Sequence, residues 1–141
     1  MSVGPAYEFV DHTGDIRFIA RGATMAEMFQ NAARALFAAM AEPEGVRPID
    51  GRAIEASAED RELLLVAWLA ACQEAFDLDR VLLCEFRVEA ISETSVRGLA
   101  RGEPYDSARH EFRTEIKAVT FHELYVREGP DGWEAAVVCD V

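Results

Sequence analysis

The sequence predicts an α+β domain in which two helices pack on a largely antiparallel β-sheet. Two segments, residues 25–40 and about 60–79, repeat apolar residues at helical spacing. The other periodic segments are short and alternate apolar with polar residues, as strands do. Their order along the chain favours helices packed on one face of the sheet. No internal repeat, low-complexity segment or long linker divides the 141 residues, so we expect a single domain spanning residues 1–141.

The first predicted strand and helix lie close to the start of the chain. Residues 16–20 form an early strand after a polar, turn-like stretch at 11–15. Thr24 and Glu27 make a capping box, which begins the first helix at residue 25. Two prolines, a glycine and glutamates in the segment 42–48 predict a solvated loop after this helix.

A further strand and the second helix follow. Residues 52–58 alternate weakly and predict a strand, and the second helix begins near Asp60 and closes at the acidic turn 77–79. The predicted buried face of this helix consists of Leu63, Leu64, Ala67, Trp68, Ala71, Cys72 and Ala75.

The remainder of the chain is rich in strands. Residues 82–88 alternate in polarity, and residues 95–100 offer a partner strand across a short polar link. Residues 123–127 and 133–138 flank Gly129-Pro130-Asp131-Gly132, in which proline presets one φ angle and glycine supplies a positive one. These last two segments are therefore predicted to form a hairpin.

The charge of the chain argues against a nucleic-acid-binding protein. The formal net charge is −12, from 26 acidic and 14 basic residues. Such a field repels phosphate backbones and favours cations or basic partner surfaces. We expect no direct nucleic-acid binding, although Arg97, Arg101, Arg109 and Arg113 fall in one short stretch and leave a local basic patch open.

The cysteines and the apolar segments favour a cytoplasmic protein. Cys72, Cys84 and Cys139 are an odd number without C-x-x-C spacing, which indicates a reducing compartment rather than a disulfide framework or a zinc site. We expect all three to be small core residues. No signal peptide is visible at residues 1–9, and the longest apolar stretch, 63–72, is too short to span a bilayer.

A crowded polar pentapeptide, Asp11-His12-Thr13-Gly14-Asp15, precedes the early strand. Crowded negative charge costs free energy unless a cation or hydrogen-bond donors offset it. An Asx-turn that leads into the strand, with His12 at the surface, explains the same residues equally well. The pentapeptide therefore does not by itself identify a metal site.

A second acidic group ends the chain, where Asp140 is followed by Val141. Chain termini often lie close together in single domains. If they meet here, Asp15, Asp140 and the Val141 carboxylate each supply oxygen to a Ca²⁺ or Mg²⁺ ion, with water completing the shell. A frayed tail is the alternative, but the apolar run 135–138 indicates that a sheet holds the end in place.

Lys117 and His122 lie in one segment and are further candidates. Lys117 is the only lysine, so a chain that otherwise uses arginine places a compact ammonium group at this position. Compositional chance also explains a single lysine. For His122, a packed strand histidine is a more common explanation than a ligand.

Taken together, these motifs resemble those of the archease family. The resemblance extends over essentially the whole chain, and the two end motifs at this separation are much more specific than either motif alone. The matching features are Asp-His-Thr-Gly-Asp opening a strand, an alanine-rich helix after Gly22-Ala23-Thr24, His110, the segment Glu115-Ile116-Lys117-Ala118-Val119-Thr120-Phe121-His122-Glu123-Leu124, and the final Asp140-Val141.

The resemblance implies an accessory protein that activates an RtcB-type RNA ligase in tRNA splicing or RNA repair. In that family the accessory protein helps the ligase to form its guanylylated histidine intermediate and permits repeated turnover. The family's metal ligands fall on Asp15, Asp140 and Val141, and its functionally important lysine falls on Lys117. The resemblance thus implies a non-catalytic partner of the ligase with a divalent cation of the Ca²⁺ or Mg²⁺ class, and we expect His12 and His122 nearby.

The chain departs from the family pattern at three positions. Gly14 stands where alanine is usual, and Phe121 and Glu123 stand where tyrosine and aspartate are common. Glycine loosens the loop, and phenylalanine removes a hydroxyl that a tyrosine would use for hydrogen bonding. None of these changes removes a predicted ligand.

Two other functions stay open. A metal-dependent hydrolase using Asp11, His12 and Asp15 needs acid and base groups with separated pKa values, and no Ser/His/Asp arrangement, phosphate-binding glycine loop or zinc motif is present. A general chaperone or modulator of RNA-modifying enzymes, such as tRNA methyltransferases, needs an interaction surface, for which residues 42–60 are a candidate.

Overall fold

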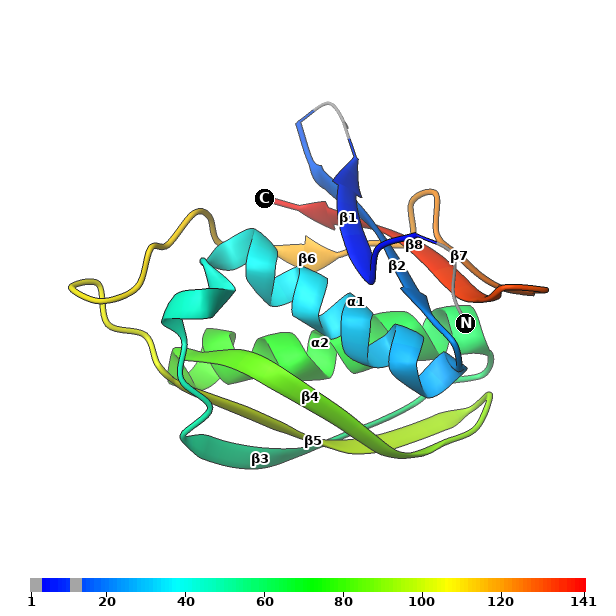
Figure 1. Cartoon of the computed structure of the whole chain (residues 1–141), viewed down its shortest axis with the longest axis horizontal. Helices are drawn as coiled ribbons and strands as arrows, with labels where there is room; N and C mark the ends of the chain where they lie inside the picture. The colour runs from blue at the N-terminus through cyan, green and yellow to red at the C-terminus, as the bar shows by residue number, and fades with distance from the viewer. Residues whose placement is uncertain (1–3, 11–13) are drawn as a thin grey trace.

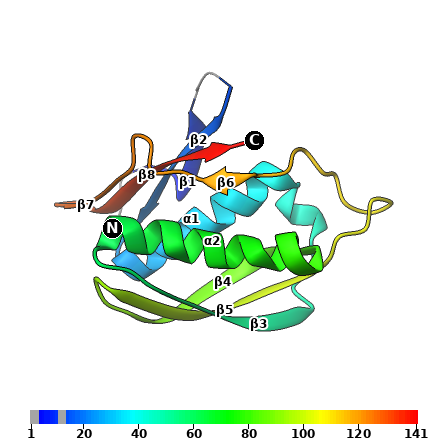
Figure 2. The same cartoon turned by 180° about the vertical axis from the view of Figure 1, so that it is seen from behind.

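The computed structural model describes residues 4–10 and 14–141, and in this part of the chain two α-helices lie between two antiparallel sheets (Figures 1 and 2). The elements are β1 Tyr7–Val10, β2 Ile16–Gly22, α1 Met25–Met40, the short 3₁₀ turn Pro43–Gly45, β3 Asp50–Ser57, α2 Arg61–Asp79, β4 Val81–Ile91, β5 Ser95–Pro104, β6 Ala118–Val119, β7 Tyr125–Gly129 and β8 Gly132–Asp140. One sheet has the order β1-β2-β8-β6, with β7 also paired to β8, and the other has the order β3-β5-β4. The predicted α+β class is confirmed, with the strands divided between two sheets that sandwich the helices.

Both helices begin at side-chain caps. The Thr24 hydroxyl accepts a hydrogen bond from the Glu27 N–H at 3.1 Å, and the Glu27 carboxylate accepts one from the Ala23 N–H at 3.0 Å. The Asp60 carboxylate accepts a hydrogen bond from the Leu63 N–H at 2.8 Å. These bonds satisfy N–H groups that a helix start leaves unpaired. The predicted starts of both helices are therefore confirmed.

α2 is buried on more sides than its sequence pattern predicted. It contacts β3, β4 and β5 of one sheet and β6 and β7 of the other. Leu65 and Leu69, outside the predicted face, are fully buried, whereas Leu63 and Ala67, inside it, are half-buried. The predicted face was too narrow because it assumed a single sheet. The apolar stretch 63–72 lies within α2, and no helix in the described ranges combines the length and apolarity that a membrane span needs.

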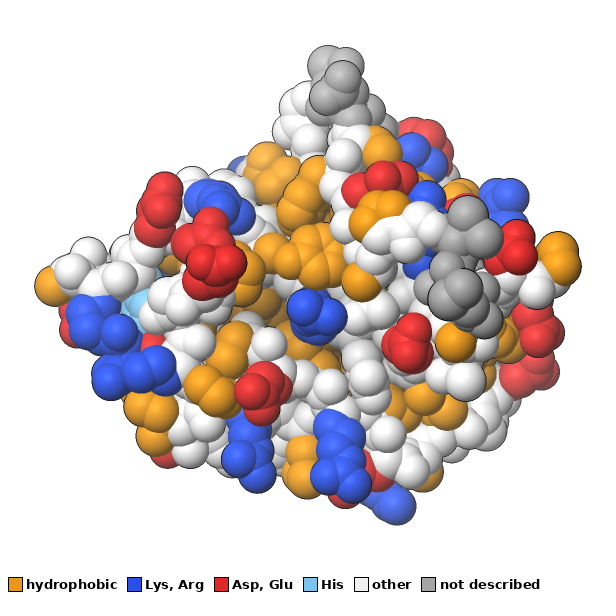
Figure 3. All heavy atoms as spheres, in the orientation of Figure 1, with side chains coloured by type: hydrophobic (Ala, Val, Ile, Leu, Met, Phe, Trp, Pro, Cys, Tyr) orange, Lys and Arg blue, Asp and Glu red, His pale blue; other side chains and the backbone are white. Residues whose placement is uncertain are grey.

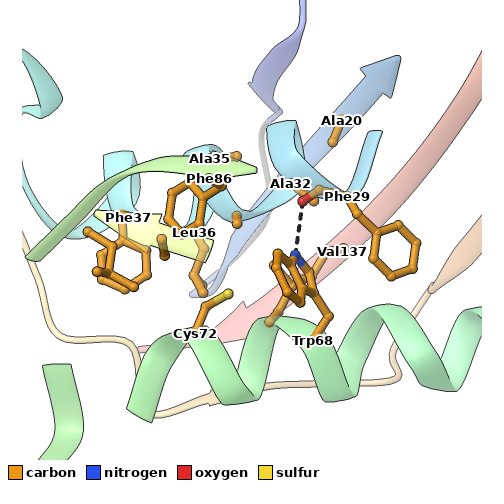
Figure 4. Packing of buried hydrophobic residues seen from close by; sticks show 14 of the residues in the cluster. Ala20, Phe29, Ala32, Ala35, Leu36, Phe37, Trp68, Cys72, Phe86 and Val137 are labelled. Atoms are coloured by element: carbon orange, nitrogen blue, oxygen red, sulfur yellow. Dashed lines mark hydrogen bonds between the residues drawn. The ribbon is translucent and has the colours of Figure 1, made fainter. Parts of the chain in front are cut away.

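Trp68 joins the two helices in the middle layer. Its side chain is fully buried, and its indole N–H donates a hydrogen bond to the carbonyl oxygen of Phe29 at 3.1 Å (Figure 4). Leu36, Cys72 and Val137 belong to the same buried cluster, so α1, α2 and β8 meet at this point. The large ring fills the space between the elements, and its one polar atom is satisfied.

β5 continues to Pro104, beyond the predicted segment 95–100, and two of its glycines lie against the backbone of β4. A Cβ atom on Gly98 would lie 2.5 Å from the carbonyl oxygen of Arg87, and one on Gly102 would overlap the carbonyl oxygen of Leu82. Glycine in a strand often marks such a close approach of two backbones. β5, the central strand of this sheet, therefore contains two glycines, although glycine is unusual inside a strand.

The other differences between the predicted and the observed strands concern two short edge strands and the last hairpin. β1 and β6 contain only four and two residues, too few for their alternation to be recognised. The predicted hairpin forms, but β7 begins at Tyr125 rather than at residue 123, because Glu123 has a left-handed φ of 53°. Gly129 pairs with Gly132, which leaves Pro130 and Asp131 as the turn.

Replacing Trp68 by phenylalanine is expected to lower the free energy of unfolding by about 1–3 kcal/mol, because the change leaves the Phe29 carbonyl without its donor and leaves a cavity. Urea unfolding followed by circular dichroism measures this difference. Leu78→Ala is the control, because Leu78 is 74% exposed and its truncation should change stability by less than about 0.5 kcal/mol. Equal losses in the two variants would contradict the role given to Trp68.

Candidate functional site

The antiparallel pairing of β2 with β8 brings the two predicted acidic ends together. Ile16 lies opposite Cys139, so Asp15, immediately before β2, and Asp140, the last residue of β8, lie at the same end of the strand pair. Cys139 belongs to the core, and Asp140 therefore points to the opposite, outer face. Burial of the Cys139 thiol and the nearby charges of Asp140 and Asp15 raise its pKa to about 12.

β6 brings Lys117 to the other side of the same strand end. Ala118 lies opposite Asp140, and the Lys117 N–H donates a hydrogen bond to the carbonyl oxygen of Asp140 at 2.8 Å. The Lys117 side chain is exposed and forms no ion pair with the residues that the structure describes. Three adjacent segments thus present Asp15, Asp140 and Lys117 along one edge, next to Val141.

His122 lies in the turn between β6 and β7. Its side chain is 66% exposed, and Nε2 lies 3.2 Å from Oε2 of Glu123. The N–H and the hydroxyl of Thr120 both donate hydrogen bonds to the Val138 carbonyl oxygen, at 3.0 and 2.8 Å, which ties the start of this turn to β8. The interpretation of His122 as a packed strand residue was therefore wrong. Asp11 and His12 lie outside the described residues.

The oxygen atoms at this edge suit a hard cation. Two carboxylates on neighbouring strands repel each other unless a counter-ion lies between them, and carboxylate oxygens are the ligands that Ca²⁺ and Mg²⁺ prefer. Within residues 4–10 and 14–141, no three His, Cys, Asp or Glu side chains gather into a complete metal site. A cation held by Asp15 and Asp140 thus needs further oxygen ligands, such as water.

A buried charged cluster, of which the sequence analysis marked only His110 as a family feature, anchors the long connection between β5 and β6. The Glu103 carboxylate accepts a hydrogen bond from the Arg47 N–H at 2.7 Å, pairs with Arg109 and lies 3.0 Å from Nε2 of His110. Because Nδ1 of His110 accepts the Asp106 N–H at 2.9 Å, the neutral ring carries its proton on Nε2 and donates it to Glu103. Burial alone raises the pKa of Glu103, but the bonds from Arg47, His110 and Arg109 lower it to about 2.

Two further contacts fix the end of this connection just before Lys117. The Gln73 side-chain amide, buried in α2, donates to the carbonyl oxygen of Ile116 at 2.5 Å. The guanidinium group of Arg113 donates to the Ala38 carbonyl oxygen at the end of α1. The backbone just before Lys117 is therefore fixed by contacts with both helices. No periodicity or motif marks Glu103 or Gln73 in the sequence, since their partners are far away along the chain.

The short arginine-rich stretch does not form one basic patch. Arg109 pairs with Glu103, and Arg113 pairs with Glu42 at 2.6 Å. Arg97 and Arg101 lie on β5 and form no ion pair with the described residues. Of the three cysteines, Cys72 and Cys139 are buried as predicted, but Cys84 is only half-buried.

Comparisons with known proteins agree on one family. A family model described as the archease protein family matches residues 7–141. A protein archease of Methanosarcina acetivorans is 40% identical, with 99% of each chain covered, and one of Methanopyrus kandleri is 36% identical, with 96% of this chain and 99% of the relative covered. The solution structure of Methanobacterium thermoautotrophicum protein 1598 is similar at 34% identity with a TM-score of 0.82, covering 96% of this chain and 99% of that chain.

The low pKa of Glu103 predicts a pH-dependent contribution to stability. The folded pKa, about 2, lies below the usual value of 4.5, so the contribution is present above the usual value and is lost as the pH falls towards the folded pKa. Glu103→Gln is therefore expected to be less stable than the wild-type protein near neutral pH, with a difference that shrinks as the solution is acidified.

Urea unfolding of the two proteins at about pH 6 and about pH 3 measures this difference. Glu85→Gln is the matched control, because Glu85 is exposed and forms no ion pair in the described part of the chain. A stability difference for Glu103→Gln that stays constant between the two pH values would contradict the prediction.

Proposed function

The chain belongs to the archease family, and from this membership we propose that it activates an RtcB-type RNA ligase in tRNA splicing or RNA repair. In this proposal it is a non-catalytic, cytoplasmic accessory protein that promotes guanylylation of the ligase and its repeated turnover. The observation that carries the proposal is the alignment of Asp15, Asp140 and Lys117 on three adjacent segments. These are the positions that the family resemblance marks as functional.

The geometry supports a shared site rather than an enclosed active site. Asp140 and Lys117 are exposed at the edge of the sheet, as is the end of the chain at Val141. We propose that Asp15, Asp140 and the Val141 carboxylate hold a divalent cation of the Ca²⁺ or Mg²⁺ class there. When bound, the cation supplies positive charge that orients and polarises phosphoryl oxygens. Lys117 adds a point charge for a phosphate or carboxylate of the ligase complex.

A neighbouring apolar surface supports contact with a protein. Phe9, Ile16, Ala38 and Ala39 line a depression that borders Asp15, and Phe9 is 46% exposed. Exposed apolar groups beside charged ones are typical of interaction surfaces. The proposed cation would therefore lie at the rim of a surface that a partner can cover.

The two alternatives differ from this proposal in measurable ways. Turnover of phosphoester or RNA substrates by the purified chain alone would favour a metal-dependent hydrolase. Recovery of a tRNA methyltransferase instead of a ligase in a pull-down would favour a general modulator of RNA-modifying enzymes.

Asp15→Asn, Asp140→Asn and Lys117→Ala are each expected to reduce stimulation of ligase guanylylation about tenfold or more. The first two changes remove proposed metal ligands, and the third removes the point charge for a phosphate or carboxylate of the ligase complex. Labelled guanylate retained on the ligase measures the effect, and circular dichroism checks that each variant is folded. Asp131→Asn is the control, because Asp131 lies in the turn at the other end of β8. Wild-type stimulation by all three variants would contradict the proposal.

A short tail added after Val141 is expected to weaken Ca²⁺ binding about tenfold, because it removes the terminal carboxylate from the end of β8 and leaves fewer oxygen ligands. Isothermal titration calorimetry with Ca²⁺ measures the affinity. The same tail placed before Met1 is the control. Equal Ca²⁺ affinity in the two tailed proteins would exclude the Val141 carboxylate as a ligand.

A further inference from the structure

A groove runs along the free edge of β4, between this strand and α1. β4 is an edge strand, because the order of its sheet is β3-β5-β4. Two hollows of about 420 and 470 Å³ adjoin along this edge and share Arg34, Cys84 and Glu85. Figure 3 views the face on which α1 and β4 lie in front, and blue Lys and Arg side chains stand over both elements. The groove is separate from the edge that carries Asp15 and Asp140.

The backbone of β4 offers the N–H and C=O groups of Phe86 to this groove. The Val88 N–H points away from β5, since it donates to the side-chain oxygen of Gln30 in α1 at 2.8 Å. Phe86 lies two residues earlier in a run without a bulge, so its N–H and C=O point to the same free edge. Exposed strand edges are templates for the addition of another strand.

One half of the groove is basic. Among the residues that the structure describes, the charged ones in its lining are Arg34, Arg87, Arg101 and one acid, Glu85, which lies opposite Arg101 across the strands. The lining therefore carries a net positive charge, although the chain as a whole carries −12.

The three groove arginines form no ion pair with the part of the chain that the structure describes. Arg34 is held by neutral groups, the Asn31 side-chain oxygen at 3.1 Å and the face of the Tyr7 ring. Most other arginines are paired with a carboxylate or have one within 4.0 Å, namely Arg21, Arg47, Arg52, Arg61, Arg80, Arg109 and Arg113. Unpaired arginines that gather beside a free strand edge leave their charge available to an anionic partner.

The other half of the groove is mostly apolar. Arg34 and Glu85 form the boundary between the two halves. Among the described residues that line the apolar half, Glu44 is the only other charged one. Its remaining lining consists of Tyr7, Phe37, Ala41, Pro43, Val46, Pro48, Leu82, Leu83 and Cys84. An occupant that fits both halves therefore needs apolar side chains at one end and carboxylates at the other.

We propose that this groove binds an extended segment of a partner protein, which adds as a strand to β4. Its acidic side chains face Arg87 and Arg101, and its apolar side chains face the half lined by Leu82 and Leu83. A peptide matches the N–H and C=O groups that Phe86 presents at the strand edge, whereas a nucleic acid does not. The described lining of the basic half also has no exposed aromatic ring for base stacking, since its aromatic residue, Phe86, is 8% exposed. The proposal is independent of the cation site and of the ligase.

Fluorescence anisotropy with a labelled, end-capped octapeptide, Val-Leu-Val-Glu-Val-Glu-Val-Glu, tests the proposal. The wild-type chain is expected to bind this peptide, and the same peptide with lysine for glutamate is expected to bind at least about tenfold more weakly. A version methylated at alternate backbone nitrogens should also bind more weakly, because it cannot donate along the strand edge. In the complex with the acidic peptide, amide hydrogen exchange at Phe86 is expected to slow.

Matched double variants separate recognition by the groove from general charge. Arg87→Gln with Arg101→Gln removes two groove arginines, and Arg97→Gln with Arg127→Gln removes two arginines that also lack an ion pair but lie outside the groove. Both changes lower the net charge by two. The first is expected to weaken peptide binding about tenfold and the second less than about twofold.

Several results would overturn the proposal. These are equal weakening by the two double variants, unchanged exchange at Phe86, or no binding of the acidic peptide to the wild-type chain. Binding of a short single-stranded RNA with the same dependence on Arg87 and Arg101 would also overturn it. So would a change in mass by light scattering in the first double variant alone, because a second copy of the chain would then occupy the edge.

Discussion

The register between β2 and β8 is the constraint on which the rest of the molecule depends. It joins the beginning of the chain to its end, and it places Phe18 opposite Val137 on the core side of the sheet. The next positions along each strand lie on the opposite face of the sheet, and at the end of this face Asp140 lies beside Asp15. A slip of one residue would turn every side chain to the other face, exposing the core residues and burying the carboxylates. The buried pairs therefore hold Asp15 and Asp140 in place at this end of the two strands.

Contacts with the two helices also fix the position of β6, which lies beside β8. The connection from β5 to β6 leaves one sheet and enters the other, and it is tied down at Glu103, at α1 through Arg113 and at α2 through Gln73. Long connections without regular structure are otherwise the mobile parts of a domain. Here the buried carboxylate of Glu103 and the buried amide of Gln73 hold the connection by hydrogen bonds, which a helix or strand would otherwise supply. The position of Lys117 consequently depends on both sheets.

The arginines fall into two groups, those that form ion pairs within the described part of the chain and those that do not. Most of them pair with acidic side chains, usually of another helix, strand or loop. These pairs neutralise part of the negative charge and fix the side chains at the surface. Surface ion pairs contribute little to stability individually, so an unpaired arginine costs the fold little and keeps its charge for a partner. The acidic edge and the basic β4 groove are thus two chemically opposite surfaces on one small domain. An acidic net charge alone describes neither of them.

The sequence by itself determined the parts that depend on neighbouring residues. The cap at Thr24, the start of α2 near Asp60, both helices and the turn at Pro130 could be predicted, because local spacing indicates each of them. A family motif marked Asp15, Asp140 and Lys117 as candidates, and their roles stay predictions. Only the tertiary structure decided which ends meet, how the strands divide into two sheets, and that α2 is buried between them. It also revealed Glu103, Gln73 and the free edge of β4, whose partners lie far away along the chain. Such long-range pairing leaves no local pattern, because each of these residues makes one specific contact and does not belong to a helical or strand repeat of apolar residues.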